Sequence, residues 1–441
     1  MKNLQKGDKK LLNAWAFYDW ANSVYTLTIA SAVFPIFYEA LFADRDHYID
    51  VFGLHLKNSA LISFITAAAF LVVSFISPLL SGIADYVGNK KSFMKFFCYL
   101  GALSCMGLYW FELTNIYVGL AFYFFGLLGY WGSLVFYNSY LPDIAFEEQQ
   151  DRISAKGYSL GYIGSVILLI INLAMIMKPE WFRIEGTATI KASDIAMRYS
   201  FVMVGVWWIL FSQYTYYYLP KGSKETGEKL TRSVVFNGFK ELKKVWGLLQ
   251  ENIPLKRYLG GFFVSSMAVQ TVMLVATYFG AQEIQWSSKE ESTIGLIICI
   301  LIIQLVAVVG AVVTSRASAK FGNIPTLIVI NAIWAVFCAL AYFITLPMHF
   351  YVMATVAGFV MGGIQALSRS TYSKLLPETS DTASFFSFYD VAEKIGIVIG
   401  MCVYGIIDQI TGSPRAAIVI LGIFFVTSIF LLRRVHKKEA L

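Results

Sequence analysis

Charged residues are scarce in this sequence. Asp, Glu, Lys and Arg together make up 14% of the 441 residues, and 57% of the chain is hydrophobic. A soluble globular domain carries about 25% charged residues. The mean hydropathy of +0.62 points the same way. The composition therefore excludes a soluble fold and predicts an integral membrane protein with the lipid bilayer as its main surroundings.

Metal-binding and nucleotide-binding patterns are also missing. The five cysteines lie in apolar runs and the four histidines are scattered, so the sequence predicts neither a metal site nor a disulfide framework. A phosphate-binding Gly-x-x-x-x-Gly-Lys-Ser/Thr loop is absent, which argues against ATP-driven transport by this chain alone. A membrane enzyme would need clustered histidines or paired acidic motifs at one interface. We therefore expect no cofactor and no catalytic activity.

The basic residues outnumber the acidic ones, 35 to 28, which gives a net charge of +7. Enrichment of Lys and Arg in cytoplasmic loops explains this excess better than nucleic-acid binding does. Most Lys and Arg residues fall in segments that the predicted topology places in the cytoplasm, including 1–12 and 433–438. We therefore expect both termini to be cytoplasmic.

Long apolar runs supply the positive evidence for the fold. They suit spans of about 20 residues and are too long and too weakly alternating for barrel strands. The sequence thus predicts an all-α polytopic membrane protein with twelve transmembrane helices. The expected spans are 15–41, 58–84, 92–111, 116–141, 157–177, 199–219, 258–280, 293–316, 325–346, 349–372, 385–407 and 415–432.

A long polar stretch, 221–257, divides the chain into an N-terminal part, 1–220, and a C-terminal part, 258–441. Its apolar residues recur at helical spacing with lysines between them, as an amphipathic helix on the inner membrane surface would require. A protein-docking site is the alternative. The apolar residues concerned are Val234, Val235, Phe239, Leu242, Val245, Trp246 and Leu249.

The stretch Gly82-Ile-Ala-Asp-Tyr-Val-Gly-Asn-Lys-Lys91 joins two of the apolar runs. Gly88 suits a sharp backbone reversal because glycine tolerates positive φ. Lys90 and Lys91 suit the cytoplasmic edge of a bilayer. We assign Gly82, Asp85, Gly88 and the two lysines to gating.

The chain also shows signs of an internal sequence repeat. Gly322-Asn323 follows Gly88-Asn89 by 234 residues, and Pro377 follows Pro142 by 235. Two landmarks whose offsets agree to within one residue predict two parallel six-helix repeats, which describe the halves of major facilitator transporters.

Four stretches carry a family resemblance. The stretch from Gly82 to Lys91 resembles the loop signature of the major facilitator superfamily, although Tyr86 and Asn89 replace the usual basic residues. The other three resemble the vacuolar amino-acid effluxer family, the Atg22-like group also called UMF1. They are Trp15-Ala-Phe-Tyr-Asp-Trp-Ala-Asn-Ser-Val-Tyr25, Asn138-Ser-Tyr-Leu-Pro142, and Gly362-Gly-Ile-Gln-Ala-Leu-Ser-Arg-Ser370 with Phe385-Phe-Ser-Phe-Tyr-Asp-Val-Ala-Glu-Lys394.

The resemblance covers essentially the whole chain and implies a twelve-helix transporter with a central cavity. For eukaryotic members it implies amino-acid efflux from the vacuole. Long extra loops are absent here, which suggests a bacterial member in the inner membrane. Ser387 stands where a glycine is usual and Met401 where a Gly-Pro is usual, so the expected bend of the eleventh helix is in doubt.

Polar residues inside the expected spans are the candidates for function, because such groups face a cavity or a partner. On the first helix Asp19 and Asn22 lie three residues apart, on one face, and Tyr18 and Tyr25 flank them. This face is a candidate site for the polar head of a substrate, with Asp19 pairing an ammonium group or carrying a proton. Alternatively, Asp19 lies at the cytoplasmic interface and pairs a lysine.

A second set of charges lies on the tenth and eleventh helices. Arg369 is a bidentate donor suited to a carboxylate, and Gln365 lies one turn before it. Asp390 and Lys394 are spaced to neutralise each other, with Glu393 beside them. We predict a network of Arg369, Asp390 and Lys394 that rearranges during transport; a static pair is the alternative. Gln270, Gln304 and Asn138 are further cavity candidates.

Asp85 has a more specific expected partner. A carboxylate is stabilised by the positive N-terminal end of a helix. In the superfamily this partner is the eleventh helix, across the domain boundary, which here starts near Phe385. The second copy has Ala319 at the equivalent position, so we expect only one half to carry this contact.

The sequence therefore predicts a secondary transporter of a small solute, most simply an amino-acid exporter that acts as a monomer. A titratable Asp19, Glu39 or Glu393 would carry a coupling proton. Transport of a sugar, drug or lipid is the alternative, and a non-transporting receptor or scaffold is a further one. The substrate, the direction of transport and the coupling ion do not follow from the sequence.

Overall fold

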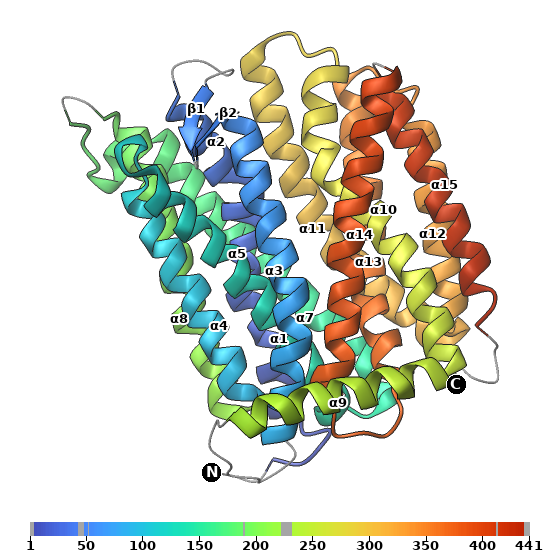
Figure 1. Cartoon of the computed structure of the whole chain (residues 1–441). Helices are drawn as coiled ribbons and strands as arrows, with labels where there is room; N and C mark the ends of the chain where they lie inside the picture. Colours follow the sequence, from blue (N-terminus) through green and yellow to red (C-terminus); the bar gives the residue numbers. More distant parts are fainter. Residues whose placement is uncertain are drawn as a thin grey trace.

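The computed structural model describes residues 4–42, 48–51, 53–187, 190–221, 232–411 and 413–435, and it is almost entirely helical (Figure 1). The first helices are α1 Lys9–Val24, a π-helical segment Tyr25–Ala32, α2 Val33–Ala40, α3 Asn58–Val87, α4 Lys90–Gly107, α5 Ile116–Ser139, α6 Leu141–Ile144, α7 Glu147–Met177 and α8 Ala192–Tyr218. The remaining helices are α9 Arg232–Glu251, α10 Ile253–Glu283, α11 Lys289–Phe321, α12 Asn323–Leu340, α13 Pro347–Lys374, α14 Thr382–Thr411 and α15 Pro414–Leu432. Short 3-10 turns cover Leu108–Trp110, Leu113–Asn115 and Pro179–Phe182.

Ten of the described helical segments are long and apolar enough to cross a membrane. Helices α4 and α14 run beside them through the bundle, although lysines begin α4 and four charged residues lie within α14 (Figure 1). With these two, the described part of the chain contains the twelve long helices that the sequence predicted.

Two groups of helices build the bundle, and each has its own hydrophobic core. One core is formed mainly by α1–α8 and the other by α9–α15. We call these groups the N-terminal half (α1–α8) and the C-terminal half (α10–α15). Tyr162 of α7 belongs to the second core and Ala383 of α14 to the first, so each half reaches into the other. The boundaries 1–220, 221–257 and 258–441 remain a prediction.

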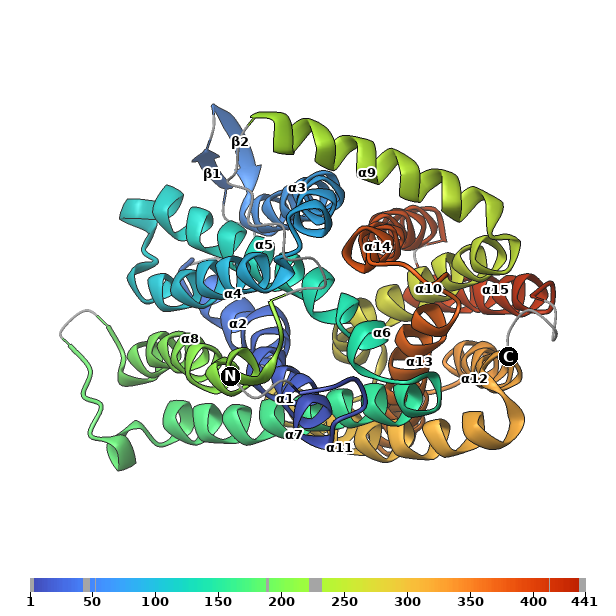
Figure 2. The same ribbon diagram turned by 90° about the horizontal axis from the view of Figure 1, so that it is seen from below.

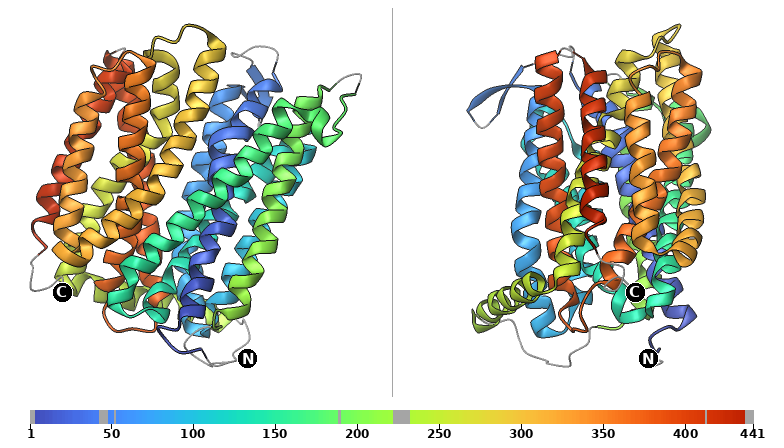
Figure 3. Two further views of the ribbon diagram at one scale, coloured as in Figure 1. Left: turned by 180° about the vertical axis from the view of Figure 1, so that it is seen from behind. Right: turned by 90° about the vertical axis from the view of Figure 1, so that its right-hand side faces the viewer.

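The two halves converge at the end of the bundle where the described chain begins and ends, and diverge toward the other end (Figure 3). We call the first end the termini side. Seen from this side, α7 and α11 lie along one edge of the molecule, and α3, α14 and α9 lie along the opposite edge (Figure 2). The contacts between the halves are therefore concentrated on the termini side.

Several helices are longer than predicted. Helix α7 begins at Glu147, ten residues before the expected start at 157, so most of the expected loop 142–156 is helical. Asp151 and Ser154 in this extension are buried because they face polar groups of the other half. Helix α11 runs to Phe321 and therefore absorbs most of the second loop copy, leaving Gly322 with a φ of 88° to make the reversal.

A β-hairpin was not predicted. Strands β1 Tyr48–Val51 and β2 Leu54–Lys57 pair antiparallel between α2 and α3, with Tyr48 opposite Lys57. The hairpin lies at the end opposite the termini (Figure 1). Its strands are four residues each, too short to stand out in a chain dominated by long apolar runs.

The predicted amphipathic helix is α9, which links the two halves. Val245 and Leu249 are buried against the bundle, and Trp246 lies 5.3 Å from the ring of Phe388 on α14. Lys244 Nζ donates to Asp381 Oδ2 at 2.9 Å, just before α14, and hydrogen bonds to Glu241 and Asp381 raise the pKa of Lys244. This part of α9 is thus docked on the protein itself. The side chains of Val234, Val235 and Phe239 lie outside the described residues.

Glycines set the close crossing of α11 and α13 in the C-terminal half. A Cβ added to Gly362 would lie 2.1 Å from the carbonyl oxygen of Ala307, and one added to Gly310 would lie 1.9 Å from that of Phe359. Both obstacles are backbone atoms, which cannot rotate away. The two helices can therefore approach this closely only with glycine at these positions.

We expect Gly362→Leu to lower the thermal unfolding temperature in detergent, because overpacking costs on the order of 1–3 kcal/mol. The matched control is Gly260→Leu on α10, where an added Cβ meets nothing within 4 Å. Equal unfolding temperatures for the two variants would contradict this account of the crossing.

Candidate functional site

A buried ion pair joins the two halves. Arg369 of α13 is 1% exposed and Asp19 of α1 is 4% exposed. Arg369 Nη1 and Nη2 each donate to Asp19 Oδ2 at 3.2 Å. The hydroxyl of Tyr137 on α5 donates to the same oxygen at 2.9 Å. Asp19 lies ten residues into α1, about 15 Å along the helix. It is therefore a buried residue of the interface between the halves.

The remaining donors of Arg369 bind other groups of the N-terminal half. Nε donates to Ser154 Oγ at 3.0 Å, Nη2 to the Ser154 carbonyl at 3.0 Å, and Nη1 to Asn138 Oδ1 at 3.3 Å. A guanidinium has five N–H groups, and these bonds use all of them. In this conformation Arg369 therefore has no donor left for a substrate carboxylate.

Aromatic rings enclose the guanidinium of Arg369. Its central carbon lies 4.2 Å from the ring centroid of Tyr158, 4.8 Å from Trp15 and 5.4 Å from Tyr137. Such cation–π contacts strengthen when water is excluded. A Cβ added to Gly157 would lie 2.5 Å from Asp19 Oδ2, so glycine makes room for the ion pair.

Helix α7 lies against α1 along a stripe of glycines. An added Cβ at Gly161 would meet Ser23 Oγ at 2.4 Å, and one at Gly164 would meet the Trp20 carbonyl oxygen at 3.0 Å. The close packing along this stripe brings Asp19 of α1 and Ser154 of α7 near enough for Arg369 to bind both.

A small polar cavity lies beside the ion pair, where Tyr158 of the N-terminal half meets the C-terminal half. Tyr158 of α7 separates the two, because its ring contacts Arg369 and also lines the cavity. The C-terminal half supplies the rest of the lining, which includes three predicted residues, Gln270, Gln365 and Glu393. The other lining residues are Phe262, Ser265, Ser266, Val269, Ile364, Ser368 and Tyr389.

Two carboxylates share one ammonium on α14. Lys394 Nζ lies 2.5 Å from Asp390 Oδ1 and 3.0 Å from Glu393 Oε2, and it is fully buried. The same atom lies 3.7 Å from the ring centroid of Trp131 on α5, so this cluster also reaches the N-terminal half. Gln270 Nε2 donates to the other Glu393 oxygen, Oε1, at 2.8 Å.

The predicted network of Arg369, Asp390 and Lys394 is wrong in its pairing. Arg369 binds Asp19, whereas Lys394 binds Asp390 and Glu393, so the three charges belong to two clusters. The i, i+4 pairing of Asp390 and Lys394 is as predicted. The Asp19–Arg369 partnership was missed because the two residues are 350 positions apart in the chain.

Asp85 binds the start of α14, across the boundary between the halves, as the resemblance to the superfamily implied. Its two carboxylate oxygens accept hydrogen bonds from the backbone N–H groups of Ser384 at 2.7 Å and Ala383 at 3.2 Å. Lys90 reinforces this contact: its Nζ donates to Thr382 Oγ1 at 2.9 Å and pairs closely with Asp143. Asp85 therefore caps the N-terminal end of α14.

The other residues assigned to gating are placed differently. Gly88 has a φ of 71° and makes the turn between α3 and α4, whereas Gly82 lies inside α3. Lys91 is 9% exposed and donates to the Leu219 carbonyl at 2.7 Å, so it joins α4 to the end of α8. The lysines are thus buried hydrogen-bond donors at the helix ends, and their predicted place at the cytoplasmic edge of the bilayer stays a prediction.

A second polar contact between the halves was missed. Asp151 of α7 accepts from Lys374 Nζ at 2.7 Å, Asn323 Nδ2 at 2.9 Å and Ser318 Oγ at 3.1 Å. These partners lie at the ends of α11 and α13 and at the start of α12. Ala319 offers no carboxylate to match Asp85. On this side of the molecule the charge comes from Asp151, again in the N-terminal half, and it binds side chains and not a helix N-terminus. A carboxylate in the supposed loop 142–156 was the available signal.

The remaining predicted residues of the first helix lie inside the N-terminal half. Tyr18 is fully buried among aromatic rings, and Tyr25 stacks on Tyr130 at 4.8 Å. Asn22 is also fully buried, with Oδ1 accepting from Ser23 Oγ at 3.3 Å. The structure therefore places Asp19 at the interface between the halves, whereas the flanking Tyr18 and Tyr25 belong to the hydrophobic core of the N-terminal half.

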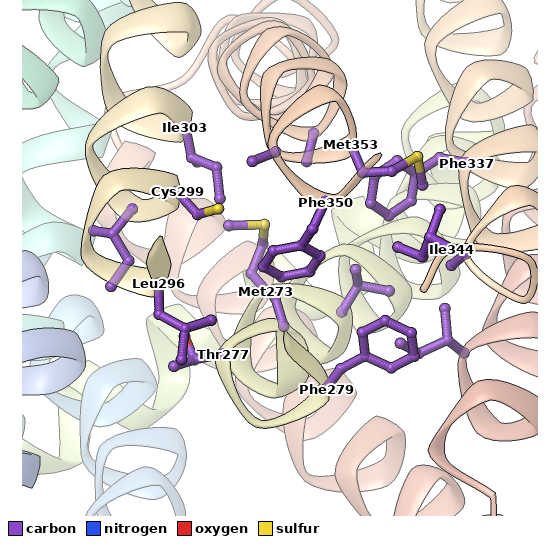
Figure 4. Close-up of a pocket in the computed structure, with 17 residues that line it drawn as sticks. Met273, Thr277, Phe279, Leu296, Cys299, Ile303, Phe337, Ile344, Phe350 and Met353 are labelled. Carbon is purple, nitrogen blue, oxygen red and sulfur yellow. The ribbon is translucent and has the colours of Figure 1, made fainter. Parts of the chain in front are cut away.

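An apolar cavity occupies the C-terminal half itself. It is formed by α10, α11, α12, α13 and α15, and its labelled lining residues include Met273, Cys299 and Phe350, with Thr277 as a polar member (Figure 4). It lies within one half, away from the ion pair, and we assign it no role.

Comparison with known proteins identifies the family. The model of the family described as "Vacuole effluxer Atg22 like" matches residues 7–441. The chain belongs to the Atg22-like family. The bacterial protein "Uncharacterized MFS-type transporter YxiO" of Bacillus subtilis is 30% identical over 99% of this chain and 97% of its own length. "Autophagy-related protein 22-2" of Aspergillus oryzae is 24% identical over 87% of this chain and 75% of its own length.

Solved structures confirm the fold of this Atg22-like protein. The major facilitator superfamily transporter FucP, in an outward conformation, aligns with a TM-score of 0.70 over 97% of this chain and 98% of its own, at 14% identity. The human organic anion transporter MFSD10 aligns with a TM-score of 0.67 over 97% of this chain and 100% of its own, at 12% identity. Family and fold are those of major facilitator transporters, which act on small molecules in membranes.

The ion pair predicts a non-additive mutational cycle. Arg369→Gln alone leaves a buried, unpaired carboxylate, which costs about 3–5 kcal/mol. Asp19→Asn combined with Arg369→Gln removes both charges and should recover most of this loss. Thermal unfolding of the purified variants in detergent measures both effects. If the double variant were as unstable as Arg369→Gln, Asp19 would not be the partner on which Arg369 depends.

Proposed function

We propose that this protein is a secondary transporter that moves a small solute by alternating access, with amino acids as the substrate class and export as the direction. The observation that supports this most is the position of the cavity. It lies where Tyr158 of the N-terminal half meets the C-terminal half, beside the Asp19–Arg369 ion pair that joins the halves. Transport by rocking of two repeats needs a site between them and contacts that can break.

The contacts on the termini side would be the closed gate of this cycle. Asp19–Arg369 forms its centre, with Asp85 at the start of α14 on one edge and Asp151 with Lys374 on the other. In this conformation the cavity would open away from the termini. We propose that the termini side is cytoplasmic, which follows from the bias of Lys and Arg, and that the protein resides in a bacterial inner membrane.

The substrate class rests on the family. The family model is described as a vacuole effluxer, and the resemblance implies amino-acid efflux for eukaryotic members. The fold is shared with sugar:proton symporters, such as the E. coli fucose:proton symporter FucP with a TM-score of 0.68, so a sugar, drug or lipid is the second candidate. The buried charges on α1, α13 and α14 argue against a receptor or scaffold, which has no need of breakable ion pairs.

Coupling to protons is part of the proposal. Among the three carboxylates named for this role, Asp19 is engaged by Arg369 and Glu39 is exposed at the end of α2. Glu393 lines the cavity with a side chain that is 18% exposed, so it is the best placed to exchange a proton. We further propose that one chain is sufficient for transport.

Proteoliposomes containing the purified protein test this proposal. Uptake and counterflow of a radiolabelled amino-acid panel would be measured with and without an imposed pH gradient. Accumulation of one amino acid driven by the gradient is the expected result. Counterflow without accumulation would indicate a facilitator. If no amino acid moved in folded protein, the amino-acid assignment would be wrong, and a sugar and drug panel would follow.

The Asp85 contact makes a separate prediction. We expect Asp85→Asn to slow counterflow while the apparent substrate affinity stays unchanged, because Asp85 touches the gate and not the cavity. A carboxylate at a helix N-terminus contributes up to about 2 kcal/mol, enough to shift a two-state equilibrium by about 5- to 30-fold. Asp50→Asn in the β-hairpin is the matched control, since its side chain is 85% exposed at the far end. Unchanged turnover in Asp85→Asn would contradict a role of Asp85 in gating.

A further inference from the structure

The charges around the cavity do not balance. On α14, Asp390 and Glu393 share the single ammonium of Lys394, so this buried cluster carries one negative charge in excess. Asp19 and Arg369, in contrast, neutralise each other. Excess charge inside a membrane is costly unless a cation or a proton joins it.

The cavity exposes this excess charge through Glu393. Asp390 and Lys394 are 4% and 0% exposed, and neither lines the cavity, whereas Glu393 does. Of the residues that line it, all in the described part of the chain, Glu393 is the one that carries a full charge. Gln270 holds one Glu393 oxygen from α10, which fixes where the carboxylate points.

The cations near the cavity are already engaged. All five N–H groups of Arg369 donate to groups of the N-terminal half, and Tyr158 stands between this guanidinium and the cavity. Lys394 is surrounded by Asp390, Glu393 and the ring of Trp131. A solute in the cavity would therefore meet an anion and neutral donors, and an anionic solute would find no free cation.

We infer that this cavity binds a protonated amine, with Glu393 as the counter-ion of the ammonium group and Gln270 as the residue that positions the carboxylate. Neutral donors and acceptors such as Gln365 and Ser266 complete the polar contacts of the solute. The inference rests on the proposed function and adds a rule of selection: a solute with an ammonium group binds, and one that carries only a carboxylate does not. The sequence suggested Asp19 as the partner of the substrate ammonium group. This inference assigns that contact to Glu393 of α14 instead.

Three derivatives of one amino acid separate the two charged groups. Leucine has both, leucinamide keeps the ammonium without the carboxylate, and N-acetyl-leucine keeps the carboxylate without the ammonium. Binding of each to the purified full-length protein in nanodiscs would be measured by isothermal titration calorimetry. We expect leucine and leucinamide to bind and N-acetyl-leucine to fail.

Substitutions identify the carboxylate. Glu393→Gln leaves Asp390 and Lys394 as a balanced pair, so the protein should fold, and affinity for leucinamide should fall about 10-fold or more. Asp390→Asn should also weaken binding, although Asp390 does not line the cavity, because Lys394 would then neutralise Glu393. Asp50→Asn, at an exposed carboxylate of the β-hairpin, is the matched control and should bind as the unmodified protein does.

The outcomes separate this inference from the proposed function. Binding of N-acetyl-leucine but not of leucinamide would overturn the ammonium subsite while leaving a solute-binding transporter. Undiminished binding of leucinamide by Glu393→Gln would overturn the role of Glu393. If none of the three bound, the ammonium subsite would be wrong, and counterflow of a solute without an amine would show that transport itself survives.

Discussion

The structure depends on a salt bridge between two helices that belong to different halves of the chain. Asp19 and Arg369 bury one charge each, and both are stable there only because they meet. Gly157 leaves room for this pair because it has no side chain, and the ring of Tyr158 lies between the pair and the cavity. The ion pair therefore both joins the halves and borders the cavity. The pair is neutral as a whole. The uncompensated negative charge therefore belongs to the α14 cluster, where Glu393 lines the cavity.

Local rules predicted much of the fold and part of the site. Apolar runs of sufficient length gave the twelve helices, and the spacing of Asp390 and Lys394 gave their pairing, because both depend on near neighbours in sequence. The attraction between a carboxylate and a helix N-terminus explains the contact of Asp85, but the resemblance to the superfamily was needed to name α14 as its partner. The turn at Gly88 followed from the freedom of glycine at positive φ.

Contacts between the halves could not be predicted in the same way. Helical spacing says which residues share a face, but it does not say whether that face meets a cavity, the other half or the core of its own half. Asp19 and Tyr18 are adjacent in sequence, yet one joins the halves and the other packs inside the N-terminal half. Asp151 was predicted to lie in a loop because the start of α7 is polar. Its carboxylate instead accepts a hydrogen bond from Lys374 of the other half.

The distance between the halves on the termini side tests the central claim most directly. Spin labels at Tyr217 of α8 and Phe321 of α11, both exposed, report it by double electron–electron resonance in a background with Cys402 replaced by serine. The unmodified sequence should give a single distance, and Asp19→Asn with Arg369→Gln should add a longer one. A label pair at Tyr217 and Phe146, within the N-terminal half, should not change. If the double variant kept only the distance of the unmodified sequence, the ion pair would not be what holds this side closed.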